Sequence, residues 1–226
     1  MILSQTNKQA AECAPAYYPG CKYEDGMALK NVFLFLAILF RYPSGAVYDE
    51  ITGKIKAFEG FFLKYAGKVP EVLPKEALQA EYITLFVNNL GFVPAYPYAS
   101  AHIETDGLLM GDAWRRLREM MIISGMTMDR SSKELEDHIS VLLEYCACLT
   151  NLLMAGIDAR QSLQTDYLKT LIEVLERYIR PMTAKFTDGI NDSASHDFYK
   201  LAGKALKGFV EDSDDFLDRT FAFENA

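Results

Sequence analysis

The chain has 226 residues, half of them hydrophobic and 12% aromatic, and a formal net charge of −8 at pH 7. This hydrophobic content excludes intrinsic disorder for most of the chain, and the length allows one domain with a sizeable core. The acidic charge argues against nucleic acid as a partner, because phosphate binding needs clustered lysine and arginine. It permits a basic peptide, or a cationic segment of another protein, as a partner.

Cysteine usage and hydropathy indicate the compartment. Four cysteines are too few and too irregularly spaced for a disulfide framework, and we expect reduced thiols at Cys13, Cys21, Cys146 and Cys148. The N-terminus lacks a basic region followed by an apolar core, so a signal peptide is not expected. The longest apolar run, 32–40, is about half as long as a membrane span. We therefore expect a cytoplasmic protein without stable membrane insertion.

In chain order, prolines and glycines without periodicity predict an N-terminal arm over residues 1–26. Apolar residues at steps of three and four then predict helices over 27–41, 46–65, 74–89, 105–124, 132–154, 162–179 and 195–217. The first is apolar on all sides and is expected to be central, whereas Pro181 is expected to lie beyond the sixth. The segment 91–102 has two prolines and several aromatic residues, which predict a packed loop.

No stretch alternates with period two between turn signals, so a sheet is not expected. The fold class is therefore all-α: a single globular bundle of seven or more helices. We expect the helical domain to cover residues 27–226, as two packed halves joined near 91–102.

The segment SSKELEDHISVLLEYCACL, residues 131–149, contains an acidic residue and a histidine side by side. Ser131 and Glu134 match a capping box, which predicts that a helix begins here. Asp137 and His138 would then lie in its first two turns, at the border between core and solvent. Local sequence alone favours a dipole-stabilising acid beside a half-buried histidine over a catalytic or binding pair.

Catalytic and metal-binding alternatives find little support. A triad of Asp137, His138 and Ser100 can be written down, but neighbours on a helix point about 100° apart, which prevents Asp137 from orienting His138. A di-metal bundle needs two Glu-x-x-His motifs, yet none of His102, His138 and His196 has a glutamate three residues before it. Phosphate-binding and nucleophile-elbow motifs are missing from the sequence. We expect no enzyme, no metal and no cofactor.

Methionines gather between residues 120 and 128, at positions 120, 121, 126 and 128. Such residues form adaptable binding surfaces in some proteins, although filling a core is the commoner use. Both interpretations stay open at this point.

Several segments in a fixed order carry a resemblance. They are EYITLF at 81–86 followed by PAYPYAS at 94–100, GLLMG at 107–111, ELEDHISVLLEY at 134–145, and DFYKLA at 197–202. Together they resemble the TorD/DmsD/NarJ family of redox-enzyme maturation chaperones. Tyr145 stands where the family usually has phenylalanine, and Ala99 where glutamate is common.

The resemblance implies a TorD-like, all-helical chaperone of anaerobic respiration. It would bind the twin-arginine signal peptide, or N-terminal segment, of a molybdopterin oxidoreductase catalytic subunit precursor. It would then assist insertion of the cofactor before export or membrane assembly. A leader with an arginine pair and an apolar stretch needs acidic groups beside an apolar groove. The expected peptide-binding residues are Asp137, His138, Glu144, Tyr98, Ser100, Leu142 and Tyr145.

Other interpretations remain open. A NarJ-like relative would serve a membrane-bound enzyme whose N-terminus is not exported. A helical regulator that binds a nucleotide or another small molecule, with His138 as a ligand contact, is the alternative from a different class. The resemblance also allows guanine nucleotide or molybdopterin as a further ligand. The chain is expected to be a monomer or a domain-swapped dimer, with Gly91 to Ala101 as the hinge.

Overall fold

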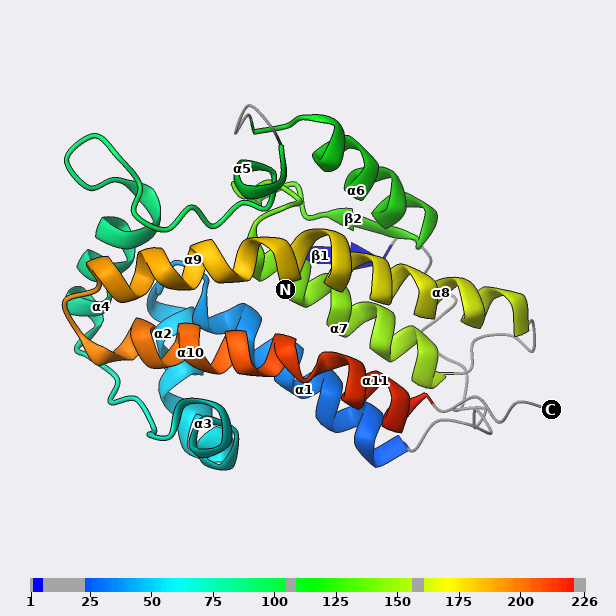
Figure 1. The fold of residues 1–226 in the computed structure, drawn as a ribbon, viewed down its shortest axis with the longest axis horizontal. Coiled ribbons are helices and arrows are strands. Elements are labelled where there is room, and N and C mark those ends of the chain that lie inside the picture. The colour runs from blue at the N-terminus through cyan, green and yellow to red at the C-terminus, as the bar shows by residue number, and fades with distance from the viewer. Residues whose placement is uncertain (1, 6–22, 105–108, 156–160, 222–226) are drawn as a thin grey trace.

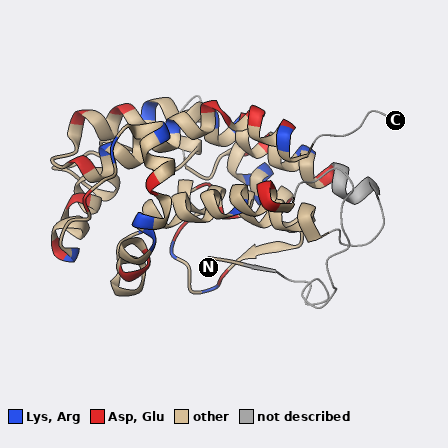
Figure 2. Ribbon diagram, turned by 90° about the horizontal axis from the view of Figure 1, so that it is seen from below, with Lys and Arg blue, Asp and Glu red and all other residues tan. Residues whose placement is uncertain are grey.

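The computed structural model describes residues 2–5, 23–104, 109–155 and 161–221, and these confirm the all-α fold (Figure 1). The α-helices are α1 (Tyr23–Leu39), α2 (Gly45–Lys54), α3 (Glu59–Ala66), α4 (Lys75–Tyr82), α5 (Ser100–Ile103), α6 (Asp112–Ile123), α7 (Ile139–Ala155), α8 (Gln161–Val174), α9 (Arg180–Ser193), α10 (Asp197–Glu211) and α11 (Ser213–Thr220). Charged residues are distributed along the outer helices (Figure 2).

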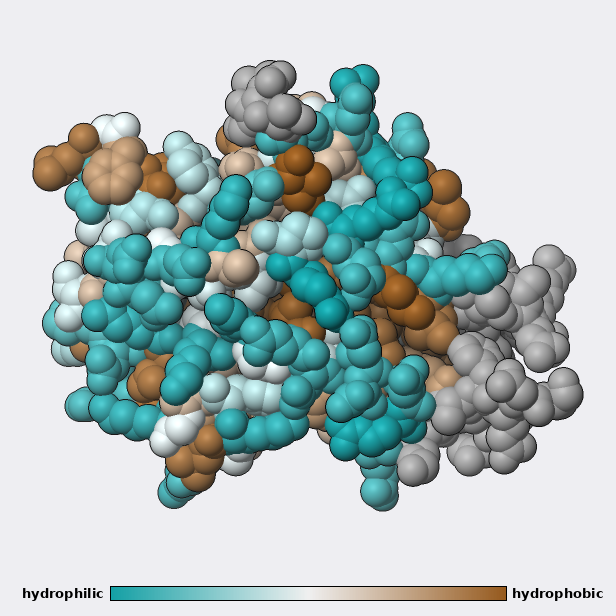
Figure 3. Space-filling model, viewed as in Figure 1, coloured by the Kyte–Doolittle hydropathy of each residue, from teal (hydrophilic) through white to brown (hydrophobic). Residues whose placement is uncertain are grey.

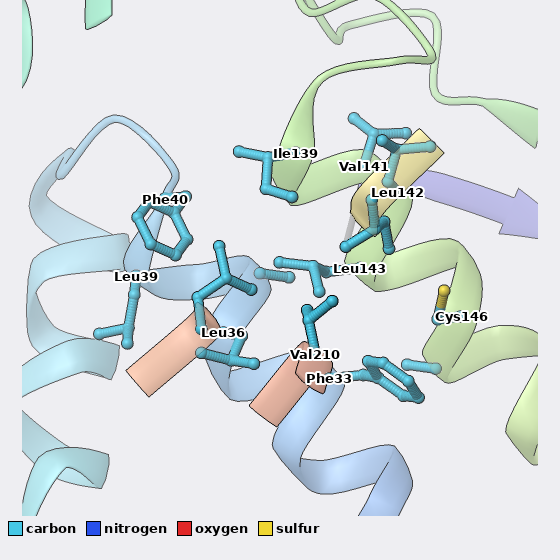
Figure 4. Close-up of a cluster of buried hydrophobic side chains, with 14 of the residues drawn as sticks. Phe33, Leu36, Leu39, Phe40, Ile139, Val141, Leu142, Leu143, Cys146 and Val210 are labelled. Carbon is cyan, nitrogen blue, oxygen red and sulfur yellow. The ribbon is translucent and has the colours of Figure 1, made fainter. Parts of the chain in front are cut away.

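Helices α1 and α7 form the centre of the molecule and pack against each other more extensively than any other described pair. Both sequences are apolar on nearly all sides, as is typical of buried helices. Figure 4 shows Phe33 and Leu36 of α1 beside Leu143 and Cys146 of α7, with Val210 of α10 completing the cluster. The expectation that the first helix is central is confirmed.

A long helical run crosses the molecule from α8 to α9 (Figure 1). The expectation that Pro181 would lie beyond the helix is wrong, because α8 continues through a π-helical turn, Leu175–Ile179, directly into α9. The proline lies in the first turn of α9, directly after the π-helical turn, where the hydrogen-bond pattern of the helix changes and a residue without an N–H is accommodated. Helix α9 then packs on α10, which in turn covers α3.

Other predicted helices are divided or shortened. The second is split by a 3-10 turn, Ile55–Phe58, and ends, as expected, at Gly67 with φ 77°. The third continues from α4 through a π-helical turn, Ile83–Val87. The fourth is represented by α6, which starts only at Asp112, and residues 105–108 lie outside the described residues. The last is divided at Asp212 into α10 and α11.

The predicted start of the fifth helix is wrong. Helix α7 begins at Ile139, and the preceding residues form turns and bends. Ser131 does not cap a helix, because its N–H and Oγ both donate to the Asp129 carboxylate, at 2.8 and 2.5 Å. The Asp129 carboxylate therefore holds Ser131 in a local turn, in place of the capped helix start that was expected.

A small sheet was not expected from the sequence. Strand β1 (Leu3–Gln5) pairs antiparallel with β2 (Met126–Met128), with Ser4 opposite Thr127. Strands of three residues are too short for an alternating pattern to be recognised. The arm expected over 1–26 thus has its first residues in a sheet and its last in α1, while Cys13 and Cys21 lie outside the described residues.

The loop between the π-helical turn and α5 carries exposed apolar side chains, seen as a brown projection in Figure 3. Leu90 is 98% exposed and Phe92 57% exposed, so the tip of this loop is less packed than expected. Among the described helices, none has the length and apolar character that crossing a membrane requires. The division into two halves stays a prediction.

Candidate functional site

The proline-containing loop and the segment before α7 are joined by hydrogen bonds. Ser100 donates from its N–H and its Oγ to Oδ2 of Asp137, at 2.9 and 2.5 Å. The N–H of Ala99 donates to the Asp137 carbonyl at 2.9 Å, and the N–H of Ile139 donates to the Pro97 carbonyl at 2.7 Å. We call residues 97–100 with 137–139 the Asp137 junction. It fixes the loop against the start of the central helix.

The Asp137 side chain is completely buried in this junction. Burial raises the pKa of its carboxyl group, and the two Ser100 donors only partly oppose this effect. Its other oxygen, Oδ1, has no hydrogen-bond partner among the described residues. Asp137 therefore acts as an internal acceptor that holds the loop.

His138 is buried beside Asp137 but has different partners. Burial lowers its pKa to about 4, helped by the Arg41 charge and opposed by Glu134. The N–H of Ser140 donates to Nδ1 at 3.2 Å, which places the proton of the neutral ring on Nε2. Nε2 lies 3.8 Å from the Glu134 carboxylate, which also accepts the Tyr98 hydroxyl at 2.9 Å. His138 is thus a neutral, packed side chain at pH 7.

The contacts of the junction do not form a catalytic triad. Ser100 donates to Asp137, whereas His138 contacts Ser140, so the order nucleophile, base and acid is not established. Within the described part of the chain, no group of three or more His, Cys, Asp or Glu side chains is arranged to hold a metal ion. The geometry instead fixes backbone segments.

Glu144 is fully buried in the second turn of α7 and forms a second centre. It pairs with Arg41, which follows α1, and accepts the N–H of Ile2 at 2.8 Å and of Leu3 at 3.2 Å. The Arg41 charge also contributes to the lowered pKa of His138. A buried carboxylate therefore joins α1, α7 and the N-terminal strand.

The remaining predicted residues lie inside the protein. Leu142 belongs to the hydrophobic core, and the Tyr145 hydroxyl is 2.8 Å from the Ser124 Oγ. Six of the seven expected peptide-binding residues are buried, and Tyr98 is half-buried. In this conformation they do not line an open groove, and their direct contact with a peptide stays a prediction.

An open cavity of about 160 Å³ lies beside the Asp137 junction, between α6 and β2. Its lining is Arg118, Met121, Ile122, Met126, Thr127, Met128 and Glu136. Glu136 accepts the Trp114 Nε1–H at 2.8 Å and lies 3.5 Å from Arg118. Because Glu136 directly precedes Asp137, the junction holds this carboxylate at the cavity. The cavity thus combines an apolar lining with an acidic group that pairs with Arg118 in the same wall.

Comparison with known proteins assigns the fold to a family. The sequence profile described as "Nitrate reductase delta subunit" matches residues 48–188, which cover both the Asp137 junction and the cavity. The chain belongs to the nitrate reductase delta subunit family. The resemblance seen in the sequence is thereby confirmed.

Two known proteins are similar to this chain in sequence. The Tat proofreading chaperone DmsD of Salmonella typhimurium is 25% identical over 133 residues, 59% of this chain and 58% of DmsD. The chaperone protein TorD of Vibrio cholerae is 23% identical over 145 residues, 64% of each chain. The chain thus matches less than two thirds of the length of either relative. Both are named as chaperones, neither as a catalyst.

A crystal structure supports the same fold. A protein from Archaeoglobus fulgidus assigned to redox enzyme maturation aligns with a TM-score of 0.53 at 23% identity, over 88% of this chain and 99% of that one. At this identity the likeness concerns the fold alone. Family membership and fold therefore agree.

The sequence interpretation missed Arg41 and the lining of the cavity. Arg41 had a signal, since it is the first charge after an apolar helix that could only be buried. The methionines at 121, 126 and 128 had been noticed, and they line the cavity. Glu136 had no signal beyond its place in the ELEDH motif.

Proposed function

We propose that the protein is a cytoplasmic chaperone for a molybdoenzyme precursor. It binds the twin-arginine signal peptide, or the N-terminal segment, of the catalytic subunit and assists cofactor insertion before export or membrane assembly. Membership of the nitrate reductase delta subunit family supports the class, and the relatives named as chaperones support the role. The client is a molybdopterin oxidoreductase catalytic subunit.

One observation carries the proposal: a cavity lined by methionine and isoleucine with a carboxylate in its wall. A leader presents an arginine pair followed by an apolar stretch. Glu136 is suited to the guanidinium groups, and Ile122 with Met128 to the apolar side chains. Unbranched methionines adapt to different apolar sequences, which suits the recognition of a variable leader.

In this proposal the seven residues predicted from the sequence have two roles. Tyr98, Ser100, Asp137 and His138 hold the loop and the segment 134–138 in place, and so position Glu136. Glu144 lies against β1, Tyr145 against Ser124 and Leu142 in the core, and they touch a leader only where the N-terminal strand moves away. All seven contribute to binding and none to bond making.

Two neighbouring isoleucines of α6 offer a matched test. Ile122 is 57% exposed and lines the cavity, whereas Ile123 is 85% exposed and does not. Ile122→Ser is expected to weaken leader binding about 10-fold, as the loss of one well-packed contact does. Ile123→Ser is expected to leave the affinity unchanged. Isothermal titration of each variant with the leader peptide of the client gives both affinities.

Two outcomes would change the proposal in different ways. No binding of any leader by the wild-type protein would contradict the proposed function. Equal affinities for the two variants would retain the function but place the leader elsewhere. Native mass spectrometry of the same samples will show whether guanine nucleotide or molybdopterin co-purifies and whether the protein is a monomer or a domain-swapped dimer.

A further inference from the structure

The N-terminal strand occupies a position that any extended segment could take. Strand β1 adds to β2 through main-chain pairing of Leu3 with Met128 and of Gln5 with Met126. The Asp129 N–H continues the ladder by donating to the Ile2 carbonyl at 2.7 Å. Main-chain pairing depends little on side-chain identity, which is the basis of peptide recognition by strand addition.

The Glu144 side chain binds the main chain of the same N-terminal segment. Its buried carboxylate accepts the N–H of Ile2 at 2.8 Å and of Leu3 at 3.2 Å. These are charge-assisted hydrogen bonds to main-chain donors, and a guanidinium group could supply equivalent donors, as Arg41 does here. The site therefore accepts a segment that presents N–H groups or an arginine to Glu144.

One side chain of the strand fills the core. Leu3 is 5% exposed and belongs to the hydrophobic cluster, with Ile2 packed against it. Removal of the strand would leave the Leu3 space in the core empty and the β2 edge unpaired. It would also leave Glu144 without the two N–H donors of the strand. Because unpaired buried groups and an open apolar space are costly, the position requires an occupant.

The strand is connected to the helical domain by a long segment. Residues 6–22 lie between β1 and α1, and the family match, which begins at residue 48, includes neither β1 nor α1. The described contact is short, with three paired residues. The cavity that contains Glu136 is lined by all three residues of β2, so a ligand in the cavity lies against the strand that β1 pairs with.

From these contacts we infer that β1 is an internal, exchangeable occupant of a strand-accepting site. The competing occupant is an extended client segment with an aliphatic residue at the place of Leu3 and N–H or guanidinium donors for Glu144. The inference rests on the proposed function for the identity of this competitor. Leader binding then displaces residues 2–5. Between clients, the same residues return and cover the site.

A reversible lock tests the exchange in the full-length protein. Ser4→Cys and Thr127→Cys introduce thiols at paired positions of β1 and β2, in a chain with Cys13→Ser and Cys21→Ser. The oxidised lock is expected to weaken leader binding at least 10-fold, and reduction is expected to restore the affinity of the wild type. Thr127→Cys alone, treated with the same oxidant, is the control. Equal affinity of the oxidised and reduced forms would overturn the inference while leaving the proposed function intact.

A second measurement does not need the leader. A synthetic peptide of residues 1–8 with Ser4→Cys, its thiol carried as a mixed disulfide with glutathione, is mixed with the full-length Thr127→Cys variant in the Cys13→Ser, Cys21→Ser background. The thiolate introduced at position 127 attacks the peptide sulfur, glutathione leaves as its thiolate, and the protein–peptide disulfide is followed by mass. Exchange predicts trapping at residue 127 at least 10-fold faster than with a scrambled peptide of the same composition. Equal rates would overturn the inference even where the leader binds. If the peptide is trapped but no leader binds, the exchangeable site stands and the proposed function fails.

Discussion

Arg41 pairs with Glu144 across the interface of the two central helices. Arg41 lies just beyond the end of α1, and Glu144 lies in the first half of α7. The glutamate side chain is fully buried and that of the arginine is 14% exposed. This ion pair therefore determines how α1, α7 and the N-terminal strand meet.

Loss of the arginine is expected to be severe. Arg41→Ala would leave the Glu144 carboxylate buried without its counter-charge and lower the free energy of unfolding by about 3 kcal/mol. The exposed pair of Lys54 and Glu50 is the control, and Lys54→Ala is expected to cost less than about 1 kcal/mol. Urea unfolding measures both. A similar small loss in the two variants would show that the buried pair is unimportant for stability.

Two substitutions separate the hydrogen bonds that Asp137 accepts from the negative charge that it carries. Asp137→Asn keeps an oxygen for the two Ser100 donors, whereas Asp137→Ala leaves both without an acceptor. We expect the alanine variant to lose about 1–3 kcal/mol of unfolding free energy. The asparagine variant should lose less, because the raised pKa of Asp137 shows that the buried charge itself is unfavourable.

The raised pKa of the Asp137 carboxyl also predicts how stability depends on pH. A carboxyl group with a raised pKa in the folded state makes the protein less stable as the pH rises through its titration range. The stability of Asp137→Asn relative to the wild-type protein should therefore be more favourable at neutral than at acidic pH. Thermal unfolding across this range provides the measurement, and a constant difference would contradict the assignment.

His138 is expected to make the protein acid-sensitive. Its pKa falls from 6.5 to about 4 on folding, so the folded state favours the neutral ring. Stability is full above about pH 6.5 and is lost as the pH falls towards about 4, by roughly 3 kcal/mol at most. His138→Gln removes this titration and should flatten the curve in that window. Denaturant unfolding of both proteins at several pH values tests this, and parallel curves would exclude His138 as the cause.

Close packing at α9 supplies a test of the loop position. A β-carbon at Gly189 would lie 2.2 Å from the Pro94 carbonyl oxygen, a backbone atom that cannot move alone. Gly189→Ala is expected to cost about 1–3 kcal/mol through overpacking. Gly53 of α2 has open space around it, and Gly53→Ala should stabilise by up to about 1 kcal/mol. The midpoint temperature of thermal unfolding should fall for Gly189→Ala and rise for Gly53→Ala.

Much of the fold was predictable from the sequence because burial leaves a clear pattern. The apolar run at 32–40 and the apolar spacing over 132–154 predicted the two central helices, which pack more extensively on each other than any other described pair. Gly67 ended its helix as expected. Pro181 misled, because a proline in a first turn and a proline after a helix look alike in sequence.

The candidate site was less predictable, because its contacts are long-range. The pattern of Ser131 and Glu134 is local, but the actual backbone is determined by hydrogen bonds that the Asp129 carboxylate and the Pro97 carbonyl accept and that the Ala99 N–H donates. Nothing near residue 144 in the sequence indicates that residues 2 and 3 donate to its carboxylate. Residues 137 and 138 were placed at the border of the core, whereas tertiary pairing buries both.

The carboxylate of Glu136 should distinguish an arginine-containing leader from a neutral one. Glu136→Gln keeps an acceptor for Trp114 Nε1 but removes the negative charge from the cavity. We expect binding of the natural leader to weaken about 5- to 10-fold, which corresponds to about 1 kcal/mol for a partly exposed charge pair. A leader with both arginines replaced by glutamine should bind the two proteins equally. Titration of each protein with each leader completes a double-mutant cycle, and the same loss for both leaders would show that Glu136 acts on the shape of the cavity and not on the arginines.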